Sequence, residues 1–264
     1  MTDVTELSFG RETGERLEQA YTTPDILRRR AIVYEALRPL PGQRILDAGC
    51  GPGFYVAELA EKVGPDGLVV GVDRSADMLR LAAARSAGRT NVEYRAGEAA
   101  ALPVHDEEFD AAVSVQMLEY LTDVDVALAE LYRALRPGGR LALWDIDWST
   151  VSWHSDDPGR MQRVLDAWDL HLADPVLPRT LGARLSATGF EDVAADGYAF
   201  VSTNLSTEAY AGAIFPVFES YLLASPALVE GEATAWAAEQ RELDERGEFF
   251  FTSVQFCFSA SKPG

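Results

Sequence analysis

The chain has 264 residues, enough for one large domain with a single core. A composition of 47% hydrophobic and 25% charged residues excludes a disordered protein. Acidic residues outnumber basic ones 42 to 23, which gives a formal net charge of −19. Because such a field repels phosphate groups, neither nucleic acid nor an anionic membrane is expected as a partner. An acidic coat that keeps the protein soluble explains this charge.

The cysteines and the N-terminus indicate which bound groups and which cellular compartment to expect. Cys50 and Cys257 are too far apart in sequence to suggest a metal cluster or a disulfide framework. The polar, acidic N-terminus lacks the basic-then-apolar order of a secretion signal. No apolar run reaches the roughly 20 residues that span a bilayer. We therefore expect a cytoplasmic protein without a bound metal, acting as a monomer or a homodimer.

The first half of the chain alternates between short apolar strands and amphipathic helices. After a loose tail (1–14), an N-terminal helical segment (15–40) contains a predicted helix at 20–37. The pattern then predicts strands at 44–48, 68–72, 91–95, 109–115 and 140–145, with helices at 55–63, 75–86 and 124–135. This alternation indicates a parallel sheet with right-handed crossovers and helices on both faces.

The second half is mostly helical. Helices are predicted at 157–171, 208–223 and 233–246, and final strands at 190–201 and 249–260. The whole chain, 1–264, is thus predicted to be one domain of the α/β class, with a doubly wound, mostly parallel seven-stranded sheet. Helical insertions at 151–178 and 203–247 are expected to form a cap over a substrate region.

A glycine-rich turn connects the first strand of this sheet to the next helix. Its sequence, Asp47-Ala-Gly-Cys-Gly-Pro-Gly53, permits a tight turn and lets a ligand approach the backbone at a helix N-terminus. A dinucleotide fingerprint needs its third glycine one residue later. The carboxylate of Asp47 would also repel a pyrophosphate, whereas it could hold an ammonium group. The spacing therefore argues against NAD.

Two acidic residues follow the next strands. Asp73 lies twenty residues beyond Gly53 at a strand end, where a carboxylate can accept both hydroxyls of a ribose. Glu98, within Gly97-Glu-Ala99, follows the third strand. Taken singly, Asp73 could be a helix N-cap and Glu98 a solvated carboxylate. Together they fall at the edge where open α/β sheets bind ligands.

These motifs, in this order, resemble the class I S-adenosylmethionine-dependent methyltransferases, in particular the small-molecule group that includes menaquinone and ubiquinone methyltransferases. The similarity covers about residues 43–145. It implies a Rossmann-like methyltransferase fold whose cofactor-binding core is 43–148, with S-adenosylmethionine as cofactor. The residues it implies for cofactor binding are Asp47, Gly49, Cys50, Gly51, Gly53, Asp73, Arg74, Met78, Gly97, Glu98, Ala99 and Gln116.

Methyl transfer is an in-line displacement, which needs positioning and, for an acceptor that carries a proton, a base. The candidate bases are His154 and Asp147, which follow the fifth strand, whereas His105 suits a solvated loop and His171 a cap helix. Residues expected at the substrate are Tyr21, Glu119, Tyr120, Trp148, Trp153, Phe215 and Glu219. We expect O-, N- or C-methylation of a small, partly apolar or aromatic acceptor.

Two alternatives remain open at this point. The protein could bind the cofactor for a reaction other than methylation or for a binding role, which a test for S-adenosylhomocysteine release would separate. It could also methylate a basic protein, since the net charge of −19 permits such a partner. The helical cap favours the small-molecule interpretation because it can enclose a compact acceptor.

Overall fold

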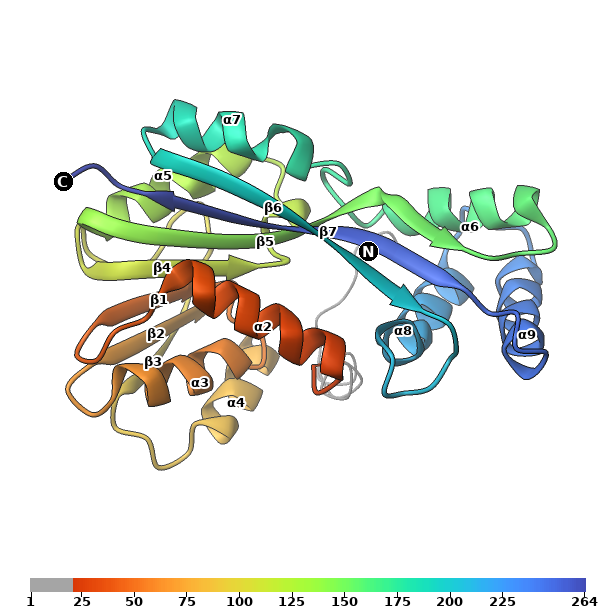
Figure 1. Ribbon diagram of the computed structural model, residues 1–264, viewed down its shortest axis with the longest axis horizontal. Coiled ribbons are helices and arrows are strands. Elements are labelled where there is room, and N and C mark those ends of the chain that lie inside the picture. The colour runs from red at the N-terminus through yellow and green to blue at the C-terminus, as the bar shows by residue number, and fades with distance from the viewer. Residues whose placement is uncertain (1–20) are drawn as a thin grey trace.

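A computed structural model describes residues 21–264 and shows one seven-stranded sheet among them (Figure 1). Its strand order is β3-β2-β1-β4-β5-β7-β6. Strands β3, β2, β1, β4 and β5 are parallel, and β7 runs antiparallel to both β5 and β6. The strands are β1 Arg44–Ala48, β2 Leu68–Asp73, β3 Val92–Ala96, β4 Phe109–Val115, β5 Leu135–Trp153, β6 Glu191–Ser202 and β7 Phe251–Ser261. This confirms the predicted α/β fold and its mostly parallel sheet.

Helices cover both faces of the sheet. Figure 1 shows α2, α3 and α4 along one face and α5 and α7 along the other. The helices are α2 Pro24–Leu37, α3 Phe54–Val63, α4 Ala76–Arg85, α5 Val124–Ala134, α6 Pro158–Asp169, α7 Pro178–Thr188, α8 Tyr210–Ala224 and α9 Glu232–Glu245, with a short 3-10 helix, η1, at Leu118–Tyr120. The central strands β1 and β4 are buried on both faces, which explains their continuous apolar sequences.

Strand β5 is much longer than the predicted 140–145. It continues past Asp145 to Trp153 and pairs with β7 at both ends of this extension, from Asp145 opposite Phe256 to Trp153 opposite Phe251, with an irregularity between Asp147 and Ser152. Beyond the parallel part of the sheet, β5, β6 and β7 extend towards α6, α8 and α9 (Figure 1). Residues 146–153 therefore lead away from the ends of the parallel strands.

The far end of the molecule has an aromatic core centred on Trp153. Its ring lies 4.6 Å from that of Phe251 and 5.5 Å from those of Phe218 and Trp236, measured between centroids. Helices α6, α8 and α9 pack around this core and match the helices expected at 157–171, 208–223 and 233–246. Helix α7 was not predicted, and the division into core and cap stays a prediction.

The predicted tail (1–14) and the start of the N-terminal segment (15–20) lie outside the described residues. Between residues 21 and 264, no helix is long and apolar enough to cross a membrane.

Candidate functional site

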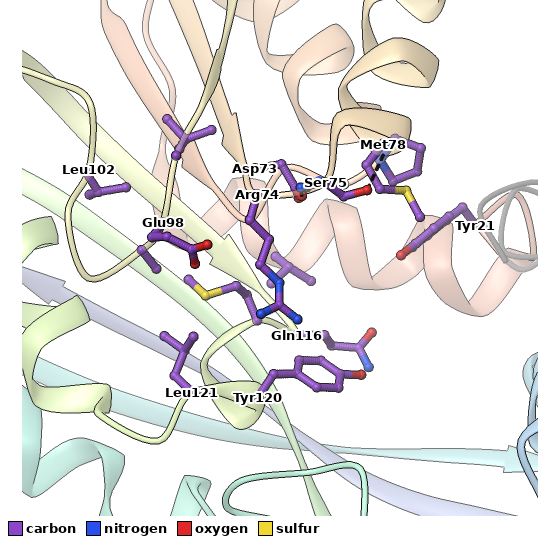
Figure 2. Close-up of a pocket in the computed structure, with 18 residues that line it drawn as sticks. Tyr21, Asp73, Arg74, Ser75, Met78, Glu98, Leu102, Gln116, Tyr120 and Leu121 are labelled. Carbon is purple, nitrogen blue, oxygen red and sulfur yellow. Dashed lines mark hydrogen bonds between the residues drawn. The ribbon is translucent and has the colours of Figure 1, made fainter. Parts of the chain in front are cut away.

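A pocket with an empty volume of about 830 Å³ opens at the carboxyl ends of the parallel strands. This is the position at which open α/β sheets bind ligands. Figure 2 shows side chains from the ends of β2 and β4 facing each other across it. Its lining residues are Tyr21, Gly49, Gly51, Pro52, Val72, Asp73, Arg74, Ser75, Met78, Gly97, Glu98, Ala99, Leu102, Val115, Gln116, Met117, Tyr120 and Leu121.

The glycine turn forms one wall of the pocket. Gly51 has a φ of +50°, and a β-carbon built on it would meet no atom within 4 Å. Its backbone therefore borders open space that a ligand can enter. Gly53 has a different role, since a β-carbon there would lie 2.7 Å from Ala82. It permits α3 to pack against α4 and does not itself line the pocket, so its expected role in cofactor binding stays a prediction.

Asp73 holds the turn and the next helix in place. Its carboxylate oxygens accept hydrogen bonds from the amides of Gly51 and Ser75, each at 2.8 Å. Ser75 in turn caps α4 through the amide of Met78 at 3.3 Å. Because each carboxylate oxygen has more than one lone pair, Asp73 can still accept hydrogen bonds from a ligand in the pocket.

The other end of the pocket is formed by the loop after β3. Glu98 and Leu102 lie there, opposite Leu121 (Figure 2). A β-carbon on Gly97 would lie 2.5 Å from Pro103, so the loop needs glycine at this position. Figure 2 also shows the side chain of Arg74 extending from the end of β2 into the pocket.

A smaller inner extension, with an empty volume of about 390 Å³, continues from the glycine turn. Asp47 lies here, 2% exposed, and its Oδ2 has no hydrogen-bond partner among the described residues. Burial, and next the charge of Asp73, raise the pKa of Asp47 to about 8. Such a carboxyl group would be stabilised by a cationic ligand.

Arg29 lines the same extension and was missed by sequence analysis. It comes from α2, is 1% exposed, and donates to Oε1 of Gln116. Its Nε has no hydrogen-bond partner in the described part of the chain. Three consecutive arginines, Arg28 to Arg30, were the available signal, but in a helix such a run is typical of a solvated surface.

Most of the expected residues come together at this site. The structure brings to the pocket or its extension Tyr21, Asp47, Gly49, Cys50, Gly51, Asp73, Arg74, Met78, Gly97, Glu98, Ala99, Gln116 and Tyr120. Glu119 lies directly behind the pocket wall, fully buried, where its Oε2 accepts from the indole of Trp148 at 3.0 Å.

Neither expected base lies at the pocket. His154 is exposed on a separate groove beside α6, and Asp147 is paired with Arg179 of α7 at 2.7 Å. The sequence prediction ended the strand at 145, so that both residues follow it at the edge of the sheet. Because β5 continues to Trp153, Asp147 lies further along it and His154 directly after its end, away from the glycine turn.

Four expected substrate residues also lie elsewhere. Trp148 and Trp153 border the groove beside α6, and Phe215 packs against Trp236 in the aromatic core. Glu219 forms an ion pair with Arg241 of α9 at 2.6 Å. None of the four lines the pocket or its extension. Residues 21–264 hold no group of three or more His, Cys, Asp or Glu side chains that could bind a metal ion.

Comparisons with known proteins agree with this geometry. Residues 46–143 match a family model described as methyltransferase domain. An uncharacterized 37.1 kDa protein of transposon TN4556 from Streptomyces fradiae is 35% identical over 161 residues, covering 61% of this chain and 46% of that protein. Demethylmenaquinone methyltransferase of Lactococcus lactis is 38% identical over 114 residues, covering 42% of this chain and 45% of that enzyme.

Solved structures of other proteins share this fold. Phosphoethanolamine N-methyltransferase 2 of Haemonchus contortus superposes with a TM-score of 0.63 at 21% identity, over 96% of this chain and 58% of that one. The chain spans less than half the length of the two curated relatives named above. By the family match, residues 46–143 are similar to a methyltransferase domain, and their fold is that of known S-adenosylmethionine-dependent methyltransferases.

Proposed function

We propose that the protein binds S-adenosylmethionine in this pocket and transfers its methyl group to a small, partly apolar or aromatic acceptor. One observation carries the proposal: the inner extension presents the carboxyl group of Asp47, whose Oδ2 has no hydrogen-bond partner among residues 21–264, together with a buried cation, Arg29. An α-amino acid carries the complementary pair, an ammonium and a carboxylate. The rest of the pocket suits a nucleoside, with Asp73 at the ribose and Glu98 at the base.

The residues present fit this cofactor. Asp47 and Arg29 would hold its amino-acid end, the open backbone at Gly51 would border it, and Met78 would pack against the adenine. When bound, the cofactor supplies an electrophilic methyl group on a sulfonium. The protein contributes position: Tyr21 and Gln116 line both the pocket and its extension, so the acceptor would meet the methyl group beside them.

Three observations support the proposed class of acceptor. A matching relative is named for methylation of demethylmenaquinone, which is a small molecule. The net charge of −19 opposes a polyanionic acceptor such as RNA. The tyrosines at the pocket, Tyr21 and Tyr120, would suit an acceptor with an apolar or aromatic surface.

Calorimetry with two probes tests the cofactor assignment. S-adenosylhomocysteine carries the amino-acid end, whereas 5′-methylthioadenosine lacks it. Asp47→Asn and Arg29→Met should weaken S-adenosylhomocysteine about tenfold or more and leave 5′-methylthioadenosine unchanged, because each variant removes one charged hydrogen-bonding group. Equal losses for both probes, or none, would contradict the placement of the amino acid in the extension.

The acceptor is sought by incubating the protein with S-adenosylmethionine and an extract of its source organism. Mass spectrometry then identifies the product that has gained one methyl group. Cofactor binding without any methylated product favours a different use of the cofactor. A methylated protein in place of a small molecule would identify a protein methyltransferase.

A further inference from the structure

Tyr21 lies where the pocket and its inner extension meet. The residues that line both spaces are Tyr21, Gly49, Gly51, Pro52, Val115 and Gln116. The proposed function places the nucleoside of S-adenosylmethionine in the pocket and its amino acid in the extension. The atom that joins these two parts of the cofactor is its positively charged sulfur. The residues shared by the two spaces would therefore surround that sulfur.

Of these shared residues, only Tyr21 and Gln116 have a polar side chain. Oε1 of Gln116 already accepts a hydrogen bond from Arg29. Figure 2 shows the side chain of Tyr21 reaching into the pocket with its hydroxyl foremost. Burial raises the pKa of this hydroxyl, so it stays neutral. Its oxygen can attract a sulfonium, because the C–H groups next to a positive sulfur carry partial positive charge and act as weak donors.

Arg30 of α2 fixes the backbone of Tyr21. Its Nη1 donates to the backbone oxygen of Tyr21 at 2.7 Å. Its Nε lies 3.0 Å from Oε1 of Glu58 on α3, whose Oε2 accepts from the hydroxyl of Tyr34 at 2.7 Å. The side chain of Arg30 is only 4% exposed, so water screens this ion pair little on that side. Arg30 thus connects Tyr21 to the helix that begins at the glycine turn.

The ring of Tyr21 packs against Phe54, the first residue of α3. Their ring centroids lie 5.2 Å apart. The guanidinium of Arg85 lies 3.4 Å from the centroid of Phe54, and its Nε donates to the backbone oxygen of Pro52 at 2.9 Å. Phe54 is thereby held against the glycine turn. Tyr21 is held at two points, its backbone by Arg30 and its ring by Phe54.

The positions of Arg30 and Glu58 show how they can influence a ligand. Neither residue lines the pocket or its extension. Any effect that they have on a bound molecule must therefore pass through a residue that does line them. The hydrogen bond to the backbone of Tyr21 supplies this connection.

We propose that Arg30 is a positioning residue, which together with Glu58 holds the hydroxyl of Tyr21 over the sulfur of the bound cofactor. This hydroxyl lets the protein distinguish S-adenosylmethionine from S-adenosylhomocysteine. The inference rests on the proposed function. The two molecules have the same nucleoside and amino acid, but the sulfur of S-adenosylhomocysteine carries neither the methyl group nor the positive charge. Tyr21 therefore favours the form of the cofactor that still has its methyl group.

Calorimetry with both molecules tests this and needs no acceptor. The measured quantity is the dissociation constant of S-adenosylmethionine divided by that of S-adenosylhomocysteine, both from one preparation of the full-length protein. Because a partly unfolded preparation affects both constants equally, a purely structural role leaves this ratio unchanged. Tyr21→Phe keeps the ring against Phe54 and removes the hydroxyl, so the ratio should rise about threefold.

Arg30→Met tests the positioning role. It should raise the same ratio about as much, because the hydroxyl is no longer held over the sulfur. Combined with Tyr21→Phe, it should add nothing to the ratio of Tyr21→Phe alone, since Arg30 acts through that hydroxyl. Arg28→Met, which removes an exposed arginine from the same helix, is the matched control and should leave the ratio unchanged. If Arg30→Met does not fold, Glu58→Ala replaces it, because the Glu58 side chain is 37% exposed and its removal should raise the ratio in the same direction.

Three results would overturn the proposal. An unchanged ratio in Tyr21→Phe would show that the hydroxyl lies away from the sulfur. An unchanged ratio in Arg30→Met, or in Glu58→Ala where it replaces that variant, would exclude the positioning role. Additive effects in the double variant, or an equal rise in Arg28→Met, would show that Arg30 acts by its charge alone. A wild type that binds neither molecule refutes the proposed function instead, whereas binding of both with an unchanged ratio in Tyr21→Phe refutes only this inference.

Discussion

Asp47 and Asp73 lie at the carboxyl ends of the neighbouring strands β1 and β2, and the charge of Asp73 helps burial to raise the pKa of Asp47 to about 8. Asp73 is held by the amides of Gly51 and Ser75, whereas Oδ2 of Asp47 has no partner in the described residues. The two carboxyl groups therefore differ in what they offer a ligand. The carboxylate of Asp73 is held in place by hydrogen bonds, whereas Oδ2 of Asp47 can pair with a cationic group of a ligand.

This difference predicts how ligand affinity varies with pH. Asp47 must lose its proton to pair with the ammonium of S-adenosylhomocysteine. Below pH 8 the affinity should therefore rise with pH, by up to about tenfold per unit. Calorimetry at pH 6, 7 and 8 measures this rise. Asp47→Asn should remove most of it, and an equally steep rise in that variant would exclude Asp47 as its cause.

The stability of the ligand-free protein should vary in the opposite direction. Because the pKa of Asp47 is raised in the folded state, its contribution to stability is complete below about pH 4, the usual range of an aspartate. That contribution is lost as the pH rises through about 8. Thermal melts between pH 4 and 8 should show a falling midpoint and a flatter dependence in Asp47→Asn. Glu119 adds a loss of the same sign up to about pH 7. A midpoint that rises over this range would contradict the prediction.

Two glycines offer a matched test of the pocket wall. Gly51 and Gly42 both have positive φ values, +50° and +79°, and a β-carbon on either would meet no atom within 4 Å. Alanine at either position should cost about 1–2 kcal/mol of stability through backbone strain. Only Gly51→Ala places a methyl group beside the pocket, so only that variant should also weaken S-adenosylhomocysteine. Similar affinities in both variants would place the ligand elsewhere.

Asp147, on the extended part of β5, and His154, directly after it, should be dispensable for ligand binding. His154→Ala should change the affinity for S-adenosylhomocysteine and any transfer rate less than twofold, because the side chain is exposed on a separate groove. Asp147→Asn should lower the free energy of unfolding only slightly, because the pair that it weakens is with the exposed side chain of Arg179. Loss of transfer in His154→Ala with intact binding would restore His154 as a candidate base.

The sequence predicted best where strands are buried on both faces. The predicted bounds of β1 and β4 agree with the structure, because continuous apolar runs next to turn residues mark such strands clearly. The extension of β5 was missed because Asp145, Asp147 and Ser149 interrupt its apolar pattern. That extension depends on pairing with β7, which lies about a hundred residues further along the chain. Local patterns carry little information about such long-range pairing.

Because sequence motifs report mainly on local structure, only some of the site residues could be predicted. The glycine turn, Asp73 and Glu98 belong to local motifs at strand ends, so their order was sufficient to bring them together. Arg29 enters the site from a helix on one face of the sheet, and nothing in its neighbours distinguishes it from a solvated arginine. His154 and Asp147 were expected at the site because they follow the predicted end of the fifth strand, and the structure ends that strand eight residues later.

Calorimetric titration of S-adenosylhomocysteine into the wild type and into Asp73→Ala tests the central claim most directly. We predict saturable binding to the wild type. Affinity should be at least about tenfold weaker in Asp73→Ala, because the variant would lose the proposed ribose contact and the bonds that hold Gly51 and Ser75. Absence of binding to the wild type, or undiminished binding to Asp73→Ala, would contradict it.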